Sequence, residues 1–291
     1  MRIRPTLSWT TVASPLPATG SVADVADVLA GRRSVVLSGA GLSTESGIPD
    51  YRGTNGRLRR HQPMTYQEFV GSAQARRRYW ARSHLGWSAI ASAAPNRGHF
   101  AVTALCASGT VCGVITQNVD GLHHAAGTRE VIELHGSLHR VRCLSCGSCT
   151  GRDALTARLR SANPDFDTTA SVLNPDGDAE LPDDVVRTFR VVGCVDCAGV
   201  LKPDVVFFGE SVPQARTREC HRMIDDADAL LVLGSSLAVM SGLRLVRRAN
   251  AAGKPVCVIN QGPTRGDPHA KVRVDRRLGD ALPELVTALS S

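Results

Sequence analysis

Short apolar runs alternate along this chain with stretches of helix-forming composition, and this alternation constrains the fold more than any other feature. The runs have the length of buried strands and lie at Ser34–Ser38, Val111–Thr116, Val131–Leu134, Val205–Phe208, Ala229–Gly234, Pro255–Asn260 and Val272–Val274. Helices are expected at Ala23–Ala30, Tyr66–Trp87, Gly98–Ser108, Arg216–Ala227 and Val239–Ala252. Because strands that alternate with helices form a parallel sheet, we predict an α/β protein with a doubly wound parallel sheet.

Two stretches interrupt the alternation and predict a smaller second lobe. Residues 53–95 are arginine-rich and helical without a strand, whereas residues 141–200 are flanked by cysteines and rich in Asp, Pro and Gly. We expect a helical insertion from the first stretch and a zinc-binding module from the second. The larger, Rossmann-like domain would comprise residues 31–52, 96–140 and 201–291, after an N-terminal extension of residues 1–30.

Composition and charge limit the other classes of protein. With 43% apolar residues and no uninterrupted apolar run of ~18 residues, the chain predicts neither disorder nor a membrane partner. The net charge of +7 comes almost wholly from arginine, which allows a nucleic-acid partner, although scattered solvated arginines explain it as well. Because no secretory signal is recognisable, the nine cysteines indicate reduced thiols or metal ligands and a cytoplasmic location.

Four of the cysteines form two Cys-x2-Cys pairs. Cys143 and Cys146 are separated by 47 residues from Cys194 and Cys197. Two such pairs can place four thiolates tetrahedrally around Zn²⁺, and a site with four protein ligands has no open position for catalysis. We therefore predict a structural zinc ion, and we expect the remaining cysteines to be free or buried thiols: Cys106, Cys112, Cys149, Cys220 and Cys257.

A glycine turn follows the first predicted strand. Gly39 and Gly41 allow the backbone to approach a pyrophosphate, although a tight strand-to-helix connection explains the turn nearly as well. Thr44 stands where a dinucleotide fingerprint has its third glycine, and Arg59, Arg60 and His61 stand where it has a ribose-binding acid. An ordinary hydride-transfer enzyme is therefore disfavoured.

Two later strands also end in polar turns. Gly234, Ser235 and Ser236 follow one strand, and Asn260, Gln261 and Gly262 follow the next. Ligands of an open parallel sheet bind beyond the carboxyl ends of its strands, so the three turns point to one crevice with hydroxyl and amide groups suited to ribose and phosphate. Helix caps and turns would explain any one of them alone.

Four further motifs complete a series that resembles one family. They are Gly47–Arg52, Thr116–Gly121, Glu133–Gly136 and Lys202–Glu210. With the glycine turn and the cysteine pairs, the chain from about Gly31 to Leu285 resembles the sirtuin family of NAD-dependent protein-lysine deacylases. The segments Asp50–Gly53, Arg78–Arg82 and Gly262–Arg265 resemble class II, particularly the mitochondrial-type branch also described as a lipoamidase and ADP-ribosyltransferase.

The resemblance implies an enzyme that consumes NAD as cosubstrate and removes acyl groups from protein lysines, giving nicotinamide, O-acyl-ADP-ribose and free lysine. The implied NAD contacts are Gly39, Ala40, Gly41, Ser43, Arg52, Gln117, Gly234, Ser235, Ser236, Asn260, Gln261, Gly262 and the backbone of Leu278. Asp50 would meet the nicotinamide carboxamide, and Tyr51 would shield the reacting ribose face. Asn118 and Asp120 would line the nicotinamide-ribose pocket and take part in catalysis.

The resemblance also implies a base and a substrate site. His135 would be the catalytic base, whereas His123, His124 and His139 are expected to be structural. The substrate peptide would pair as an added strand along a segment that includes Val206, Phe207, Gly209 and Glu210. Tyr79 and Arg82, at i and i+3 of a helix, resemble a pair that binds acyl chains ending in a carboxylate, although a solvated helix face or an ion pair of Arg82 fits as well.

Two alternatives stay open. An NAD-dependent protein ADP-ribosyltransferase shares the first chemical step, and a zinc-ribbon nucleic-acid-binding protein would explain the arginines but none of the polar strand ends. The expected partners are acyl-lysine proteins or peptides, with nucleic acid disfavoured. The acidic stretch from Asn163 to Asp184 fits a solvated loop or a loop that reaches the active-site entrance.

Overall fold

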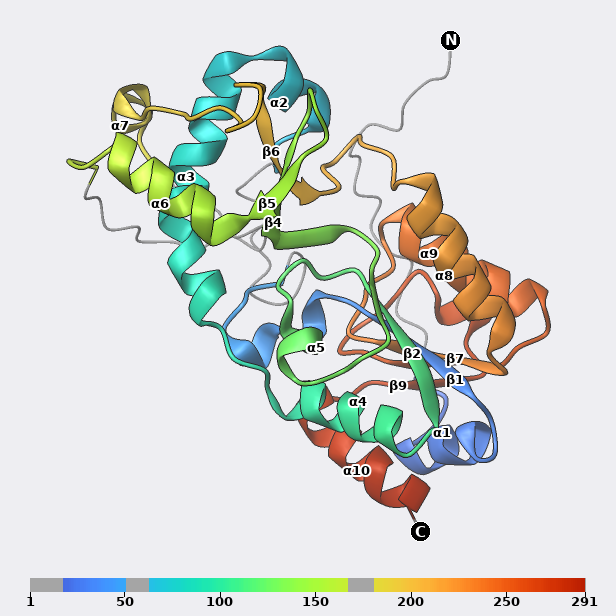
Figure 1. Cartoon of the computed structure of the whole chain (residues 1–291). Helices are drawn as coiled ribbons and strands as arrows, with labels where there is room; N and C mark the ends of the chain where they lie inside the picture. Colours follow the sequence, from blue (N-terminus) through green and yellow to red (C-terminus); the bar gives the residue numbers. More distant parts are fainter. Residues whose placement is uncertain (1–17, 51–62, 167–180, 291) are drawn as a thin grey trace.

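The computed structural model describes residues 18–50, 63–166 and 181–290 of the chain, and it has two lobes (Figure 1). The larger lobe is built on a six-stranded sheet in the order β3-β2-β1-β7-β8-β9. Its strands are β1 Ser34–Ser38, β2 Val111–Thr116, β3 Val131–Glu133, β7 Ala229–Leu233, β8 Val256–Ile259 and β9 Val272–Val274. All five pairings are parallel, which confirms the predicted doubly wound sheet. The order reverses beside β1, where such sheets form a ligand crevice.

Helices cover both faces of this sheet. One face carries α1 Val22–Leu29, α4 Arg97–Ala107 and α10 Leu278–Ser290, and the other carries α8 Gln214–Asp226 and α9 Met240–Ala251. In β1, Val36 packs toward the first group, whereas Val35 and Leu37 pack toward the second. This alternation follows from the two-residue period of a strand and explains why β1 is apolar at every inner position.

Helix α1 belongs to the larger lobe. Ser21 caps it in a capping box with Asp24, and the buried residues Val25 and Leu29 join the core formed with α10. The packing of the larger lobe therefore starts before residue 31, within the segment that the sequence analysis assigned to an N-terminal extension. The amphipathic spacing of this short helix buries its apolar face on the sheet.

The smaller lobe combines helices with a three-stranded antiparallel sheet in the order β5-β4-β6. Its elements are α2 Tyr66–Gly71, α3 Ala73–Ser92, β4 Gly136–Cys143, β5 Cys149–Gly151, α6 Arg152–Ala162, α7 Asp183–Thr188 and β6 Leu201–Val205. Phe69, Trp80, Leu159 and Phe189 are fully buried in its core. The short helix α5 Leu122–Ala125 lies between β2 and β3 in the chain.

Two expected elements differ in the structure. The strand expected at Val205–Phe208 lies earlier in the chain, as β6 at Leu201–Val205. It pairs with β4 in the smaller sheet, because a short apolar run does not reveal which sheet it joins. The helix expected from Tyr66 to Trp87 is divided at Ser72, whose extended backbone and side chain cap α3 through the N–H of Ala75. In the described ranges, no helix is both long and apolar enough to cross a membrane.

Candidate active site and metal centre

A cavity of about 630 Å³ lies at the carboxyl ends of β1, β2 and β7. This volume falls within the range of small-molecule sites. The larger lobe contributes polar strand ends such as Gln117 and Ser235, and the smaller lobe contributes apolar side chains such as Met64 and Ile90. The cavity therefore joins a polar half to an apolar half, an arrangement suited to a polar cosubstrate that meets an apolar group.

The glycine turns form the floor of the polar half. Gly39 and Gly41 lead from β1 into the short 3-10 helices at Ala40–Leu42 and Thr44–Ser46, and the N–H of Gly41 donates to the Gly234 carbonyl at 2.9 Å. A Cβ on Gly39 would lie 2.7 Å from the Ser235 Cβ, and a Cβ on Gly41 would lie 2.9 Å from the Gly234 Cα. The two turns are in contact, so a side chain at Gly39 or Gly41 would separate the two strand ends.

A buried chain of hydrogen bonds connects the glycine turn to Asn118, Ser43 and Asp120. The Asn118 amide donates to the Gly39 carbonyl at 3.1 Å and to the Ser43 hydroxyl at 3.0 Å. The Ser43 hydroxyl donates to the Asp120 carboxylate at 2.7 Å, and that carboxylate also accepts the N–H of Leu122 at 2.9 Å. Burial raises the pKa of Asp120, whereas these two hydrogen bonds oppose the rise. The polar groups at this end of the cavity are thus held in place before any ligand binds.

His135 also lines this cavity. Its Nδ1 is 3.0 Å from the main-chain carbonyl of Gln117, and its Nε2 is 2.7 Å from the Ser241 hydroxyl. Because a carbonyl can only accept, the proton of the neutral ring is on Nδ1, and Nε2 has the lone pair. Burial lowers the pKa of His135 to about 4, and the charge of Arg216 acts in the same direction. The ring is therefore neutral near pH 7 and can accept a proton at Nε2.

The structure brings most of the expected NAD contacts to this cavity. Those that line it are Gly39, Ala40, Gly41, Ser43, Asp50, Gln117, Asn118, Asp120, Gly234, Ser235 and Ser236. Asn260, Gln261, Gly262 and Leu278 are not among the lining residues of the described chain. Asn260 is buried, and its amide donates to the carbonyls of Gln261 and Gly262. Tyr51 and Arg52 lie outside the described residues, as does most of the acidic loop.

The expected substrate residues divide in the same way. Val206, Phe207, Gly209 and Glu210 line the cavity, and so does Tyr79, which packs against Phe207 with ring centroids 5.2 Å apart. Arg82, one turn later on α3, is not among the lining residues of the described chain. The N–H of Val206 already donates to the His135 carbonyl, and the N–H of Phe207 donates to the Glu210 carboxylate. An added peptide strand would have to use other backbone groups of this segment.

The other singled-out histidines lie outside the cavity lining. His123 is buried, with Nε2 2.8 Å from the Ser38 hydroxyl, and His139 Nε2 is 3.0 Å from the Asp120 carbonyl. His124 lies 3.9 Å from Glu133. These contacts agree with structural roles. The sequence analysis did not single out Thr217, His221, Ser241 and Arg244, which line the cavity from α8 and α9. The sequence feature that could have identified them is their position in predicted helices next to a polar strand end.

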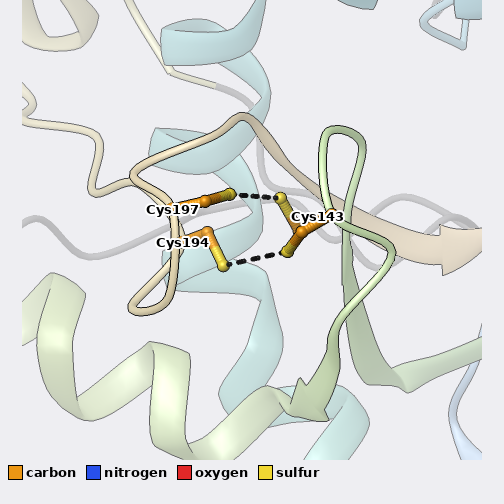
Figure 2. A group of neighbouring side chains, drawn as sticks. Cys143, Cys194 and Cys197 are labelled. Atoms are coloured by element: carbon orange, nitrogen blue, oxygen red, sulfur yellow. Dashed lines mark hydrogen bonds between the residues drawn. The ribbon is translucent and has the colours of Figure 1, made fainter.

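The four paired cysteines lie close together in the smaller lobe, and Figure 2 shows the side chains of Cys143, Cys194 and Cys197 directed toward one another. The Cys143 and Cys197 sulfurs are 3.6 Å apart, the Cys146 and Cys194 sulfurs are 3.8 Å apart, and all four lie within 4.8 Å of one another. Tetrahedral zinc with bonds of ~2.3 Å requires sulfurs ~3.8 Å apart. Cys149 is exposed on β5 and outside the group. The donor set fits a structural zinc ion.

Comparisons with known proteins agree with this geometry. The family model described as "Sir2 family" matches residues 39–241. The chain is 59% identical over 282 residues to "NAD-dependent protein deacetylase 1" of Streptomyces coelicolor, covering 97% of this chain and 94% of that protein. It is 44% identical over 256 residues to "NAD-dependent protein lipoamidase sirtuin-4, mitochondrial" of Bos taurus, covering 87% and 81% respectively. The solved structure described as "Sir2-p53 peptide-NAD+" superposes with a TM-score of 0.73 at 28% identity, covering 91% of this chain and 96% of that one.

Proposed function

This chain belongs to the Sir2 family and is an NAD-dependent protein-lysine deacylase, and on that premise we propose how its residues divide the reaction. The overall change releases nicotinamide and free lysine and leaves the acyl group on ADP-ribose. The observation that carries the assignment of roles is the position of His135. It lines the same cavity as the polar strand ends and the apolar side chains, and its basic nitrogen is 2.7 Å from the hydroxyl of Ser241, which lines that cavity too.

We propose that NAD is bound by the polar half of the cavity. The cavity-lining set from Gly39 to Ser236 would hold it directly, and the buried side chains of Asn118 and Asp120 would meet its nicotinamide-ribose end. Four further residues would extend this site beyond the cavity lining: Asn260, Gln261, Gly262 and Leu278. Tyr51 and Arg52 would complete it. When bound, NAD supplies an electrophilic ribose carbon on loss of nicotinamide. The support for the site is that its polar groups are already oriented and buried.

We propose that His135 is the general base. It would accept a proton at Nε2 from a hydroxyl bound in the cavity, and its Nδ1–H would stay on the Gln117 carbonyl throughout. That hydrogen bond stabilises the imidazolium, since it raises the pKa of His135 against the effect of burial. A neutral, oriented base is thereby combined with a group that stabilises its protonated form.

We propose that the acyl-lysine enters the apolar half of the cavity. Met64, Tyr79, Ile90, Leu138 and Phe207 line this half, and such side chains fit the methylene groups of an acylated lysine. The expected binding of an acidic acyl group by Tyr79 and Arg82 stays a proposal, supported by the position of Tyr79 in the lining. Acyl-lysine peptides are the proposed partners, since the solved relative is described with a peptide and NAD.

Two further parts of the proposal concern the setting of the enzyme. The four cysteine thiolates would hold one structural Zn²⁺, which stabilises the smaller lobe. We also propose the cytoplasm as the location, without membrane or nucleic-acid partners, and the grouping of four cysteines as metal-binding thiolates supports a reducing compartment.

Mass spectrometry of the products from NAD and an acetyl-lysine peptide tests the proposed division of roles. The expected products are nicotinamide, O-acetyl-ADP-ribose and the free-lysine peptide, and neither O-acetyl-ADP-ribose nor the free-lysine peptide should form with His135→Ala. ADP-ribose attached to the protein substrate in place of deacylated peptide would favour the ADP-ribosyltransferase alternative. Products at the wild-type rate from His135→Ala would refute the role of His135 alone.

A further inference from the structure

Ser241 lies in the first turn of α9, and its contact with the His135 ring is shorter than the 3.0 Å contact of the Gln117 carbonyl with that ring. Its hydroxyl oxygen is 2.7 Å from Nε2, and both residues line the cavity. We propose that Ser241 is a positioning residue for the catalytic base: it aligns the imidazole and occupies the basic lone pair until a substrate hydroxyl takes its place. This inference rests on the proposed role of His135.

The hydrogen-bond directions follow from the donor and acceptor inventory. The Gln117 carbonyl has no proton, so Nδ1 of His135 must donate to it. Nε2 is then an acceptor, and the Ser241 hydroxyl must be the donor in the second bond. A half-turn of the ring would replace both nitrogens with C–H groups and break both bonds. The pair of contacts thus selects one tautomer and one orientation of His135, with its lone pair toward Ser241.

The position of Ser241 is itself fixed through Gln117. A Cβ on the next residue, Gly242, would lie 2.6 Å from Gln117 Oε1, so the start of α9 packs directly on the Gln117 side chain. That side chain donates to the Ser235 hydroxyl at 2.7 Å, while the main chain of Gln117 holds His135. One residue at the end of β2 therefore fixes both partners of the Ser241–His135 hydrogen bond.

A serine hydroxyl suits a contact that has to be exchanged during turnover. Nε2 has a single lone pair. A substrate hydroxyl that transfers its proton there must therefore first displace the hydrogen bond that Ser241 donates to Nε2. Ser241 neither gains nor loses a proton in this exchange: its O–H rotates away from Nε2, and the substrate proton moves to Nε2. A neutral hydrogen bond contributes little net free energy, so the incoming hydroxyl readily offsets its replacement.

The rival explanation is that Ser241 only stabilises the start of α9. Kinetics of two reactions distinguish the two roles, using NAD, an acetyl-lysine peptide and labelled nicotinamide. Exchange of nicotinamide into NAD reports the step before the base acts, and peptide deacetylation reports the complete reaction. We expect Ser241→Ala to lower kcat for deacetylation about tenfold, to leave nicotinamide exchange and KM for NAD within about twofold, and to leave Tm unchanged.

Three companion variants make the result decisive. Ser241→Thr keeps the hydroxyl and should retain most of the deacetylation rate, and Ser88→Ala, a solvent-exposed serine on α3, should behave as wild type. His135→Ala gives the loss expected when the base itself is absent. If His135→Ala retained activity, the proposed function of His135 would fail; if only His135→Ala were impaired, the proposal for Ser241 alone would fail.

A spectroscopic measurement tests the hydrogen bond without reference to activity. In protein labelled with ¹⁵N-histidine, the His135 resonances, identified by their loss in His135→Ala, should report a proton on Nδ1. Ser241→Ala should shift the Nε2 resonance toward that of an imidazole nitrogen without a hydrogen bond, and Ser241→Thr should not. Unchanged Nε2 resonances in Ser241→Ala, or a parallel fall in exchange, deacetylation and Tm, would overturn the proposal.

Discussion

Lys202 Nζ lies 2.9 Å from Glu210 Oε2, and this ion pair ties β6 to the cavity wall. The lysine side chain is only 5% exposed and the glutamate side chain 24%. Glu210 also accepts the N–H of Phe207, and Lys202 Nζ lies over the Phe207 ring at 4.4 Å. Burial lowers the pKa of Lys202, and the nearby Glu210 carboxylate opposes that shift. The positive charge of buried Lys202 is thus stabilised by Glu210, a residue that lines the cavity.

We predict that Glu210→Gln destabilises the protein more than the double change Lys202→Met with Glu210→Gln. The single change leaves a buried ammonium without its carboxylate and should lower the free energy of unfolding by about 2–4 kcal/mol. Glutamine still accepts the Phe207 N–H, so the loss reports the charge pair. Urea denaturation of wild type, Glu210→Gln, Lys202→Met and the double variant measures it. A double variant as unstable as the sum of the two single variants would contradict this account.

His135→Ala is predicted to abolish deacylation and to leave NAD affinity within about threefold of wild type. The reason is that Nε2 is the basic nitrogen of a cavity-lining residue, whereas the buried hydrogen-bond chain of Asn118, Ser43 and Asp120 does not contact it in the described hydrogen bonds. Single-turnover kinetics and NAD titration measure the two quantities. A large loss of NAD affinity would assign His135 to binding instead.

The larger sheet was predictable because its strands are continuous apolar runs. The bounds of β1, β2 and β9 agree with those runs residue for residue. β6 was misplaced because Lys202 and Pro203 interrupt the apolar pattern, and the tertiary pairing that satisfies Lys202 is not visible in the sequence. Helix α10 was not predicted, and Pro283 inside it is a residue that ordinarily signals a helix end.

Some residues of the candidate site were predictable from sequence motifs, and others depend on tertiary packing. His135, Asn118 and Asp120 were identified through motifs that stand together in the sequence, and the structure gathers them at one cavity. Ser241 was not identified, because its contact with His135 joins residues 106 positions apart and depends on how α9 packs on Gln117. Contacts of this kind come from packing, which local sequence patterns do not encode.

Cys143→Ala is predicted to lower zinc content and Tm together, because four thiolates saturate the metal and the loss of one removes a quarter of the ligand set. Cys149→Ala is the matched control, since Cys149 is exposed and outside the group, and it should change neither quantity. Metal analysis and thermal denaturation provide the readouts. One zinc per chain in a Cys143/Cys197 double variant would show that the ligand set is wrong.

Acidification is predicted to destabilise the protein through two buried histidines. His99 and His123 are 0% and 2% exposed, and burial lowers their pKa values to about 4 and about 3, below the ordinary value of 6.5. The unfolded chain therefore binds more protons than the folded chain in this range. Their contribution to stability is complete above about pH 6.5 and is lost as the pH falls toward 4 and 3, by at most about 1.4 kcal/mol per histidine per pH unit.

His99→Asn tests this pH dependence, because the asparagine oxygen can still accept the Asn96 N–H that His99 Nδ1 accepts at 3.3 Å. The variant should lose less Tm than wild type between pH 7 and pH 5. Zinc content is measured at each pH, so that metal loss is not mistaken for histidine titration. Parallel Tm curves for the two proteins would exclude His99 as a source of the acid sensitivity.

The last prediction concerns the acyl group, and it depends on α3. Tyr79 is buried in the cavity wall against Phe69 and Phe207, and Arg82 follows one helical turn later, on the same side of the helix. If the pair binds a terminal carboxylate, glutaryl-lysine peptides should be turned over faster than acetyl-lysine peptides. Arg82→Met should then erase that preference and leave the turnover of acetyl-lysine peptides unchanged. The reason is that a guanidinium forms charge-assisted hydrogen bonds with a carboxylate and forms none with an acetyl methyl group. Steady-state kinetics on the two peptides measure the ratio. An equal loss on both would make Arg82 a structural residue of α3, and acetyl-lysine as the better wild-type substrate would leave the apolar wall of Met64 and Ile90 to determine which acyl groups fit.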